Sequence, residues 1–301
     1  MASIRRTKSG TWQVRYWDPN EHQHARNFAR KTDATRFAAA VETDKSRGDW
    51  LDPRLAKITF AEWSDDWLGQ IAHLKAKTRL NYENTLRKHV LPAFGQAQVG
   101  LVDRATMRRF VSELTARGAG PDTVRVAVQV ARSVLEVALD AGAIKANPAR
   151  GLSVPRAVKA EKLFLTAEQV ETLAEAIDPI FATLIRFAAY TGLRAGELAA
   201  IRVGRLDMLR GTLEVAESLS DVGGYLEFGP TKTYARRHVP LPPFLRDELA
   251  VYLTRRELSG RDDLVFTALR GAPLRHNLFY RKKFKPAVAR AGLPQSLRFH
   301  D

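Results

Sequence analysis

The stretch TGLRAGEL at residues 191–198 constrains the fold of this chain more than any other. An apolar run over residues 180–190 predicts a buried helix leading into it. Gly192 is expected to end that helix, because glycine takes the left-handed conformation of a helix C-terminus without steric penalty. A second amphipathic turn is predicted directly afterwards. Arg194 therefore lies at a junction of two buried elements, where its planar guanidinium either binds a phosphate or carboxylate, or pairs locally with Glu197.

The charge of the chain predicts a polyanionic partner. Lys and Arg number 48 against 33 Asp and Glu, which gives a net charge of +15 and a pI near 10.2. Nucleic acid is the first candidate and an anionic membrane surface the second. The membrane is disfavoured, because no apolar run approaches the roughly 20 residues needed to span a bilayer. Residues 1–20 are also too charged for a signal peptide. The protein is expected in the cytoplasm.

The residue types that commonly hold metals give no recognisable motif. There is no cysteine, so disulfides, thiolate nucleophiles and zinc–thiolate sites are excluded. The seven histidines form no HExxH motif and no paired ligand spacing. A glycine-rich loop of the kind that cradles nucleotide phosphates is also missing. The sequence predicts no metal site and no cofactor.

Residues 1–56 are predicted to form a small basic module. Residues 11–17 alternate in the period of a strand, 18–20 form a turn, and 24–30 provide a return strand. Asp33 is expected to cap a following helix. The module is interpreted as three short strands and one helix. Several of its arginines either line one sheet face for DNA binding or form a solvated basic surface: Arg5, Arg6, Arg15, Arg26 and Arg30.

Residues 57–157 are predicted to form a four-helix domain after a linker around Asp52-Pro53 and Lys57. The first helix carries Trp63 and Trp67, whose spacing is more typical of a core than of a ligand site. The other three are expected over residues 78–90, 103–117 and 121–142. Pro92 should follow the helix over residues 78–90. The predicted DNA-contacting residues lie at a basic edge: Lys75, Lys77 and Arg79.

Residues 158–301 are predicted to form a mixed, mainly helical domain after an extended strap that contains Lys159. Thr166 begins a capping box. Strands are expected over 212–215, 225–228 and 237–241, with residues 229–233 in a hairpin between the last two. A helix over 244–258, a buried strand over 264–266 and a helix over 275–291 complete it. The predicted fold class is thus multidomain α+β, with a small antiparallel sheet in the last domain.

The C-terminal part of this domain is free of acids from Leu264 to His300 but holds eight basic residues. Such a run favours a surface that faces phosphates, because a merely solvated face usually mixes charge signs. The predicted DNA-contacting residues are Arg275, Arg281, Lys282 and Lys283.

Three motifs in this order carry a family resemblance: TGLRAGEL at 191–198, GPTKT at 229–233, and LRFHD at 297–301. Together they resemble the tyrosine recombinases of the phage integrase family. The likeness covers essentially the whole chain and is to three-domain, lambda-integrase-like members of the kind found in actinobacteriophages. It implies an arm-site DNA-binding module, a core-binding helical domain and a catalytic domain that together close around duplex DNA.

The resemblance also implies a role for individual residues. Arg194 matches the first of two arginines that hold the scissile phosphate, and Glu197 matches an acid that supports the site. Lys232 matches the lysine that protonates the leaving 5′ oxygen. His300 matches the first residue of a His-x-x-Arg box. A tyrosine hydroxyl attacks phosphorus to give a 3′-phosphotyrosyl link, with no metal or nucleotide required.

The sequence departs from the family pattern at its end. The second arginine and the nucleophilic tyrosine are expected beyond Asp301, so the chain is interpreted as truncated and by itself inactive. The five tyrosines of the last domain all precede the box and are poor substitutes on topology: Tyr190, Tyr225, Tyr234, Tyr252 and Tyr280. Tyr190 is expected to be part of the core.

The leading hypothesis is a recombinase that integrates phage DNA into a host chromosome. The resemblance implies core-type and arm-type DNA sites, a homotetramer on DNA, a host DNA-bending factor and a directionality factor. An architectural DNA-binding protein of the same fold without catalysis is the alternative. A topoisomerase is disfavoured, because relaxation needs no second class of DNA site.

Overall fold

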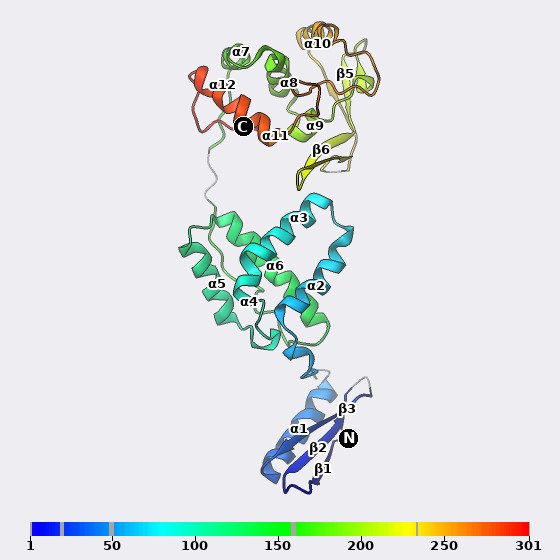
Figure 1. The fold of residues 1–301 in the computed structure, drawn as a ribbon, viewed down its shortest axis with the longest axis vertical. Helices are drawn as coiled ribbons and strands as arrows, with labels where there is room; N and C mark the ends of the chain where they lie inside the picture. Colours follow the sequence, from blue (N-terminus) through cyan, green and yellow to red (C-terminus); the bar gives the residue numbers. More distant parts are fainter. Residues whose placement is uncertain (1, 19–20, 48–50, 158–160, 233, 301) are drawn as a thin grey trace. The chain divides into compact units, whose positions relative to one another are not determined.

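The computed structural model describes residues 2–18, 21–47, 51–157, 161–232 and 234–300. Backbone contacts divide the chain into two units, residues 1–158 and 159–301 (Figure 1). The first unit holds two separate hydrophobic clusters, one in its N-terminal module and one in its helical part. The division into three domains at residues 56 and 157 stays a prediction, although the later boundary agrees with that of the two units.

The N-terminal module is a three-stranded antiparallel sheet with one helix packed on it. Its elements are β1 (Ser3–Arg6), β2 (Trp12–Trp17), β3 (Gln23–Phe28) and α1 (Lys31–Arg47). The strands pair in sequence order, which places Ile4, Val14 and Tyr16 on the helix side. The expected cap at Asp33 is wrong. The helix starts two residues earlier, so Asp33 lies inside its first turn, where its charge still favours the helix dipole.

The helical part of the first unit is a four-helix bundle, as predicted. Its elements are η1 (Leu55–Lys57), α2 (Phe60–Gln70), η2 (Ile71–His73), α3 (Ala76–Thr85), η3 (Leu86–Val90), α4 (Leu91–Phe94), η4 (Val99–Leu101), α5 (Arg104–Ala116) and α6 (Pro121–Asp140). Trp63 and Trp67 are both 5% exposed and belong to the core. The expected linker near Lys57 is thus partly helical.

The prediction that the second helix ends before Pro92 is wrong. Helix α3 continues through the π-turn η3 into α4, with Pro92 inside the continuous helical segment. A proline ring clashes with the carbonyl four residues earlier in a regular α-helix. The wider π-turn directly before it changes that local hydrogen-bonding pattern. The same arrangement recurs in the second unit, where η7 (Tyr280–Phe284) comes before Pro286.

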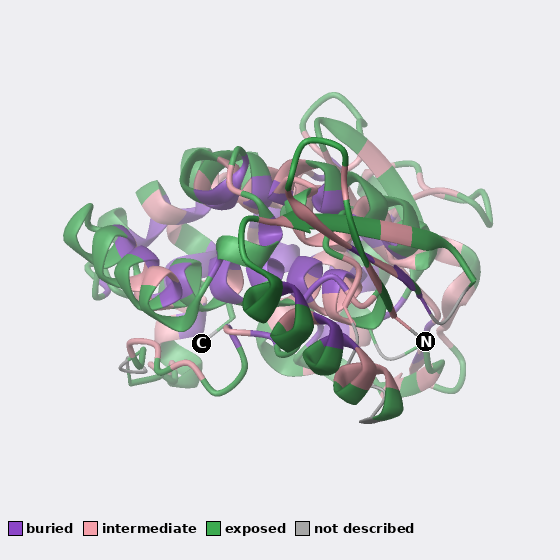
Figure 2. Cartoon of the chain, turned by 90° about the horizontal axis from the view of Figure 1, so that it is seen from below, coloured by how far each residue is buried: buried purple, intermediate pink, exposed green. Residues whose placement is uncertain are grey.

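The second unit is mainly helical. Its helices are α7 (Ala167–Ala176), η5 (Pro179–Phe181), α8 (Ala182–Thr191), α9 (Ala195–Leu198), η6 (Val203–Arg205), α10 (Pro243–Arg255), α11 (His276–Phe279), η7 and α12 (Lys285–Arg290). The capping box predicted at Thr166 is present. In α7, Val170, Leu173 and Ala174 are buried at helical spacing, which gives this helix one apolar side. Figure 2 shows buried and exposed residues mixed along the helices of the chain. None of the described helices is long and apolar enough to cross a membrane.

The strands of the second unit form two antiparallel sheets. The first contains β4 (Leu206–Asp207), β5 (Thr212–Val215) and β8 (Arg237–Pro240), and the second is a hairpin of β6 (Glu217–Val222) and β7 (Tyr225–Pro230). The predicted hairpin between β7 and β8 is therefore wrong. Strand β7 pairs with β6, which the sequence analysis missed, and β8 pairs with β5. Leu264 forms only an isolated bridge with Arg202 in place of the predicted strand.

Candidate catalytic site

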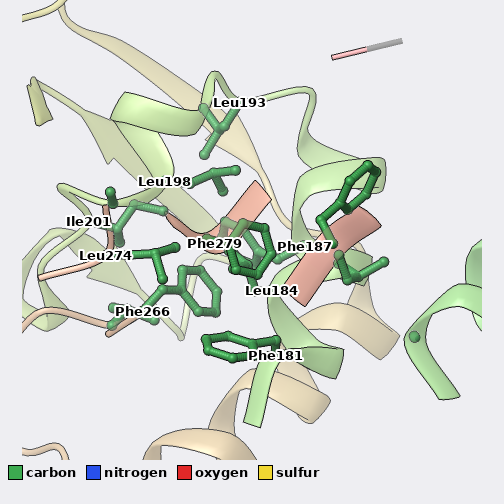
Figure 3. Close-up of a cluster of buried hydrophobic side chains, with 14 of the residues drawn as sticks. Phe181, Leu184, Phe187, Leu193, Leu198, Ile201, Phe266, Leu274 and Phe279 are labelled. Carbon is green, nitrogen blue, oxygen red and sulfur yellow. The ribbon is translucent and has the colours of Figure 1, made fainter. Parts of the chain in front are cut away.

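The site is built on the junction between α8 and α9. Gly192 ends α8 with φ +62°, the left-handed conformation that its lack of a side chain permits. Leu193 and Leu198 are 2% and 1% exposed and lie in the cluster that also contains Phe279 (Figure 3). Because Leu193 and Leu198 are anchored in the core, the backbone of Arg194 is held at the N-cap position, directly before α9. Its side chain is 54% exposed.

Glu197 is the buried centre of the site. Its carboxylate is 1% exposed and accepts hydrogen bonds from two arginines. The Arg194 backbone N–H and Nη1 donate at 3.0 and 3.1 Å, and Arg237 Nη1 and Nη2 donate at 3.0 and 2.6 Å. Burial alone would raise the pKa of Glu197, but the bonds from Arg237 and Arg194 outweigh it and lower the pKa below its usual value. The carboxylate therefore stays ionised between the two guanidinium groups.

Arg237 is a member of the site that the sequence analysis missed. It begins β8, and its bidentate contact with Glu197 joins residues 40 positions apart. No local spacing reveals such a pair. The one available signal was a cation at the first position of the strand that follows Lys232.

The structure shows the local pairing of Arg194 and leaves part of its guanidinium exposed. Arg194 pairs with Glu197 through Nη1, as the local interpretation required. Among the described residues, however, its Nε and Nη2 donate to no partner, and more than half of the side chain is exposed. Two arginines and one carboxylate leave a net charge of +1 at this point. The cluster can therefore position a guanidinium and still present an anion-binding group.

His300 lies beside Arg194, as the motif order predicted. The backbone N–H of Ala195 donates to His300 Nε2 at 3.2 Å, which requires that nitrogen to be unprotonated. The ring lies against those of His276 and Phe299, with centroids 5.8 and 5.3 Å apart. Partial burial and the charge of Arg194 lower the pKa of His300. Burial and His300 do the same for the pKa of His276. The imidazole that faces the site is thus neutral near pH 7.

Lys232 is exposed on the segment that joins β7 to β8. Its neighbour Thr231 is 1% exposed and donates to the carbonyl of Ala235 at 3.0 Å, which anchors the start of this segment. No ion pair or hydrogen bond connects Lys232 to another described residue, including Arg194 and His300. The structure thus brings Arg194, Glu197 and His300 together, and no hydrogen bond or ion pair among the described residues joins Lys232 to them.

The β6–β7 hairpin packs directly on the short helix that carries the site. A side-chain carbon added at Gly196 would lie 2.5 Å from Ser218 Oγ and 2.8 Å from the Leu219 carbonyl oxygen. Arg275 holds the tip of the hairpin, donating to Asp221 Oδ2 and to the Gly224 carbonyl at 2.7 Å each. Gly196 is therefore required here for close backbone approach.

The basic run near the C-terminus is used partly inside the protein. Arg275 pairs with Asp221, and Lys283 pairs with Asp178 at 2.6 Å. The run contains no acids of its own, and the acids that pair with it come from other elements. Both side chains keep about a third of their surface exposed, at 33% and 32%, so their contact with phosphates stays a prediction. Arg281 and Lys282 are exposed and make no ion pair with a described residue.

The predicted arginines of the N-terminal module divide between the two faces of its sheet. Arg5 and Arg15 lie on the open face, and both donate through Nε to Gln13 Oε1 at 3.0 Å. Arg6 lies on the other face, 6.0 Å from the Trp12 ring, because strand residues alternate. Arg26 also lies on that other face, 5.0 Å from the Phe37 ring. One sheet face therefore does not hold all of them.

The remaining predicted DNA-contacting residues differ in exposure and in ion pairing. Lys77 is exposed on α3, and Lys75 is half-buried at its start. Arg79 pairs with Glu83 at 3.5 Å. Lys159 lies outside the described residues. The prediction that Tyr190 belongs to the core is wrong. Its side chain is 39% exposed and packs edge-on against Phe244, because it falls on the outer side of α8.

The fold is a helical bundle followed by a mainly helical domain with a buried carboxylate that holds two arginines, and comparisons with known proteins identify its class. Residues 163–301 match the model of the phage integrase family, and residues 59–115 match the phage integrase N-terminal SAM-like domain. A putative prophage phiRv2 integrase of Mycobacterium tuberculosis is 27% identical over 99% of this chain and 81% of its own length. The integrase of Mycobacterium phage D29 is also 27% identical, over 99% of this chain and 82% of its own length.

Solved structures share the fold. The Tn1549 transposon integrase in complex with transposon right end DNA has a TM-score of 0.71 at 18% identity, covering 81% of this chain and 83% of its own. A lambda integrase tetramer bound to a Holliday junction has a TM-score of 0.63 at 18% identity, covering 99% and 87%. The chain belongs to the phage integrase family of tyrosine recombinases, and its function is site-specific DNA recombination. The alternative of a non-catalytic architectural protein is not favoured.

Proposed function

We propose that Arg194 binds the non-bridging oxygens of the scissile phosphodiester and stabilises the charge that develops there in the transition state. Its guanidinium is exposed, carries two uncommitted nitrogens toward the solvent side, and is held at a fixed backbone position. Glu197 and Arg237 act as positioning residues. The carboxylate orients Arg194, and Arg237 keeps that carboxylate ionised and in place.

Proton transfer is assigned to the two remaining motif residues. Lys232 protonates the departing 5′ oxygen, for which its exposure and mobile ammonium suit it once DNA is bound. His300 assists at the phosphate as a neutral imidazole. Since Nε2 accepts the Ala195 N–H, the proton of that tautomer is on Nδ1, which is the nitrogen available to donate. A tyrosine hydroxyl forms the 3′-phosphotyrosyl link that preserves the bond energy for rejoining.

The macromolecular partner is duplex DNA. We assign core-type sites to the bundle and the second unit, through Lys75, Lys77, Arg281 and Lys282, and arm-type sites to the N-terminal module. The solved relatives bound to core-site DNA and to a Holliday junction support this assignment and a tetramer on DNA. We further propose that the chain acts in the bacterial cytoplasm, on phage and host DNA, with a host DNA-bending factor and a directionality factor.

The observation that carries the proposal is the buried Glu197 joined to two arginines, one of which faces solvent. The test compares Arg194→Ala with Arg210→Ala in the protein expressed from its native reading frame. Arg210 is also an exposed arginine of the second unit, with a carboxylate partner, Asp207, three residues away. Strand cleavage should fall by about two or more decades in Arg194→Ala alone.

Binding to the same DNA and the melting temperature should change little in either variant, because the clamp acts on transition-state charge. If the Arg194→Ala protein cleaves at the normal rate, Arg194 does not act on the phosphate, and its role is limited to pairing with Glu197.

A further inference from the structure

Four potential metal ligands gather at one end of the N-terminal module, outside the recombination site. Ligand atoms of Asp18, His24 and Asp52 all lie within 4.8 Å of one another. His22 adds a fourth, with Nδ1 3.4 Å from Asp18 Oδ2. The ligands come from the end of β2, the start of β3 and the segment after α1. Their distance along the chain explains why histidine spacing predicted no metal site.

The centre of this group is a buried carboxylate. The Asp18 side chain is 2% exposed, and its Oδ2 lies 2.9 Å from His24 Nε2. Its Oδ1 accepts the His22 backbone N–H at 2.9 Å, which orients the carboxylate. Both imidazoles thus direct a ring nitrogen to the same oxygen. His24 is 10% exposed and stacks on Tyr16 with ring centroids 5.3 Å apart, so its ring is held in place.

Asp52 brings a second negative charge to the same place. It is 12% exposed, and Arg54 Nη2 donates to its Oδ2 at 2.9 Å. The four side chains and Arg54 have a net charge of −1 with neutral histidines, within a chain of net charge +15. A divalent cation would offset this negative charge.

We propose that Asp18, His22, His24 and Asp52 form a zinc-binding site that ties the segment after α1 to the ends of β2 and β3. Two imidazoles and two carboxylates are ligands that Zn²⁺ accepts in tetrahedral geometry. Ligands of one zinc lie at about 2.0–2.2 Å from it, hence at most about 4.4 Å apart. The ligand atoms of Asp18, His24 and Asp52 lie within 4.8 Å of one another, so these three need only small movements to coordinate one ion. His22, whose Nδ1 lies 3.4 Å from Asp18 Oδ2, would turn toward that ion as the fourth ligand. Imidazole ligands favour zinc over magnesium.

A metal site would stabilise the N-terminal module, because its hydrophobic core is small. Its fully buried apolar residues are Val14, Tyr16, Ala34, Ala38 and Val41, two of which are alanines. Domains of this size commonly need a disulfide, a metal or a partner in addition to their core. The chain has no cysteine, so a metal would supply the cross-link.

The test uses the whole chain after treatment with a chelator and dialysis. Zn²⁺ is titrated in competition with a chromophoric chelator, with and without excess Mg²⁺. We expect one tightly bound Zn²⁺ per chain, unaffected by Mg²⁺, and slower hydrogen exchange across β2 and β3 when Zn²⁺ is present. His22→Asn and Asp52→Asn should each weaken binding about tenfold or more and lose this protection.

His22 is 65% exposed, so His22→Asn should leave the metal-free melting temperature unchanged and separates lost binding from lost folding. The matched control is His73→Asn, an exposed histidine of the bundle. His300→Asn is a second control, because the recombination site also contains paired imidazoles. Binding that is unchanged in His22→Asn and Asp52→Asn, or absent at micromolar Zn²⁺, would reduce the group to a hydrogen-bonded network. Neither result depends on recombination activity.

Discussion

Two regions of this molecule place a pair of arginines around one acceptor, and they do so differently. In the N-terminal module, Gln13 Oε1 accepts from Arg5 and Arg15 on an open sheet face. In the second unit, the Glu197 carboxylate accepts from Arg194 and Arg237 while almost fully buried. The first acceptor is a neutral amide and the second is a charged carboxylate.

The two acceptors suit different tasks: the amide preserves positive charge for DNA affinity, and the carboxylate fixes the position of a guanidinium. An amide holds two guanidinium groups without neutralising them, so the open face keeps a charge of +2 for phosphates. A buried carboxylate removes one unit of charge but fixes geometry through charge-assisted, bidentate bonds. The first arrangement suits DNA binding through counterion release. The second suits a group that must meet one phosphate in one orientation.

Exchanging the two acceptors should have very unequal effects. We expect Glu197→Gln to lower the free energy of unfolding of the second unit by about 3 kcal/mol, because two arginines lose their buried counter-charge. Recombination should be lost with it. Gln13→Glu should change stability by at most about 0.5 kcal/mol, since its ion pairs are exposed. Denaturation followed by hydrogen exchange across α8 and across β2 measures both units separately.

The opposite order of effects would show that burial does not distinguish the two clusters. Equal, small effects would mean that Glu197 is replaceable by any acceptor of its shape.

The rigidity of the second cluster should also depend on Gly196. Gly196→Ala would place a methyl group against Ser218 and the Leu219 carbonyl, so either α9 or β6 must move. We expect a loss of about 1–3 kcal/mol and slower strand cleavage. Gly229→Ala is the matched control, because nothing lies within 4 Å of its added carbon. If both alanine variants behave alike, the hairpin does not position α9.

The open-face arginines should act mainly on salt dependence. We expect Arg5→Gln and Arg15→Gln each to reduce the slope of log K against log salt by about 0.9 for arm-site DNA. Arg6→Gln removes the same charge from the other sheet face and should leave the slope nearly unchanged. The measurement is a binding titration over 50–200 mM salt. A larger change of the slope in Arg6→Gln than in Arg5→Gln and Arg15→Gln would show that the DNA binds the helix-covered face and contradict the proposal.

Local chemistry made much of this fold predictable from the sequence. Gly192 ends α8 because few other residues take its conformation, and Thr166 caps α7 through bonds to neighbouring residues. The four bundle helices follow from apolar periodicity. Arg194, Glu197 and His300 were found through motif order. In the structure Arg194 bonds to Glu197, and His300 accepts the backbone N–H of the adjacent Ala195.

Features that depend on distant partners were missed. Strand β7 pairs with β6 and not with β8, a choice made by the whole sheet and not by the turn sequence. Arg237 reaches Glu197 from β8, a strand that is placed by its pairing with β5. The acids that neutralise Arg275 and Lys283 likewise come from other elements. A composition count along the sequence therefore overestimated the charge left for DNA.

The smallest expected effect is a pH dependence that separates the histidines of the site from its carboxylate. Partial burial lowers the pKa of His276 and His300 in the folded unit. The unfolded chain protonates these residues near their ordinary pKa of about 6.5. As the pH falls below that value, the unfolded state binds more protons than the folded state, so stability must decrease. Glu197, whose folded pKa is lowered, acts in the same direction but only below its unfolded pKa of about 4.5.

The two windows can be resolved because they scarcely overlap. We expect hydrogen exchange across α8 to accelerate, after correction for its intrinsic pH dependence, between pH 7 and 5.5 in the unaltered chain. His276→Gln should flatten this change while leaving the response below pH 4.5 intact. His276 is the better choice for substitution, because it packs on His300 without bonding to Arg194 or Glu197. If the change between pH 7 and 5.5 persists in His276→Gln and in His300→Gln, other groups cause it, and the neutral imidazole at the N-terminus of α9 contributes nothing to the stability of the site.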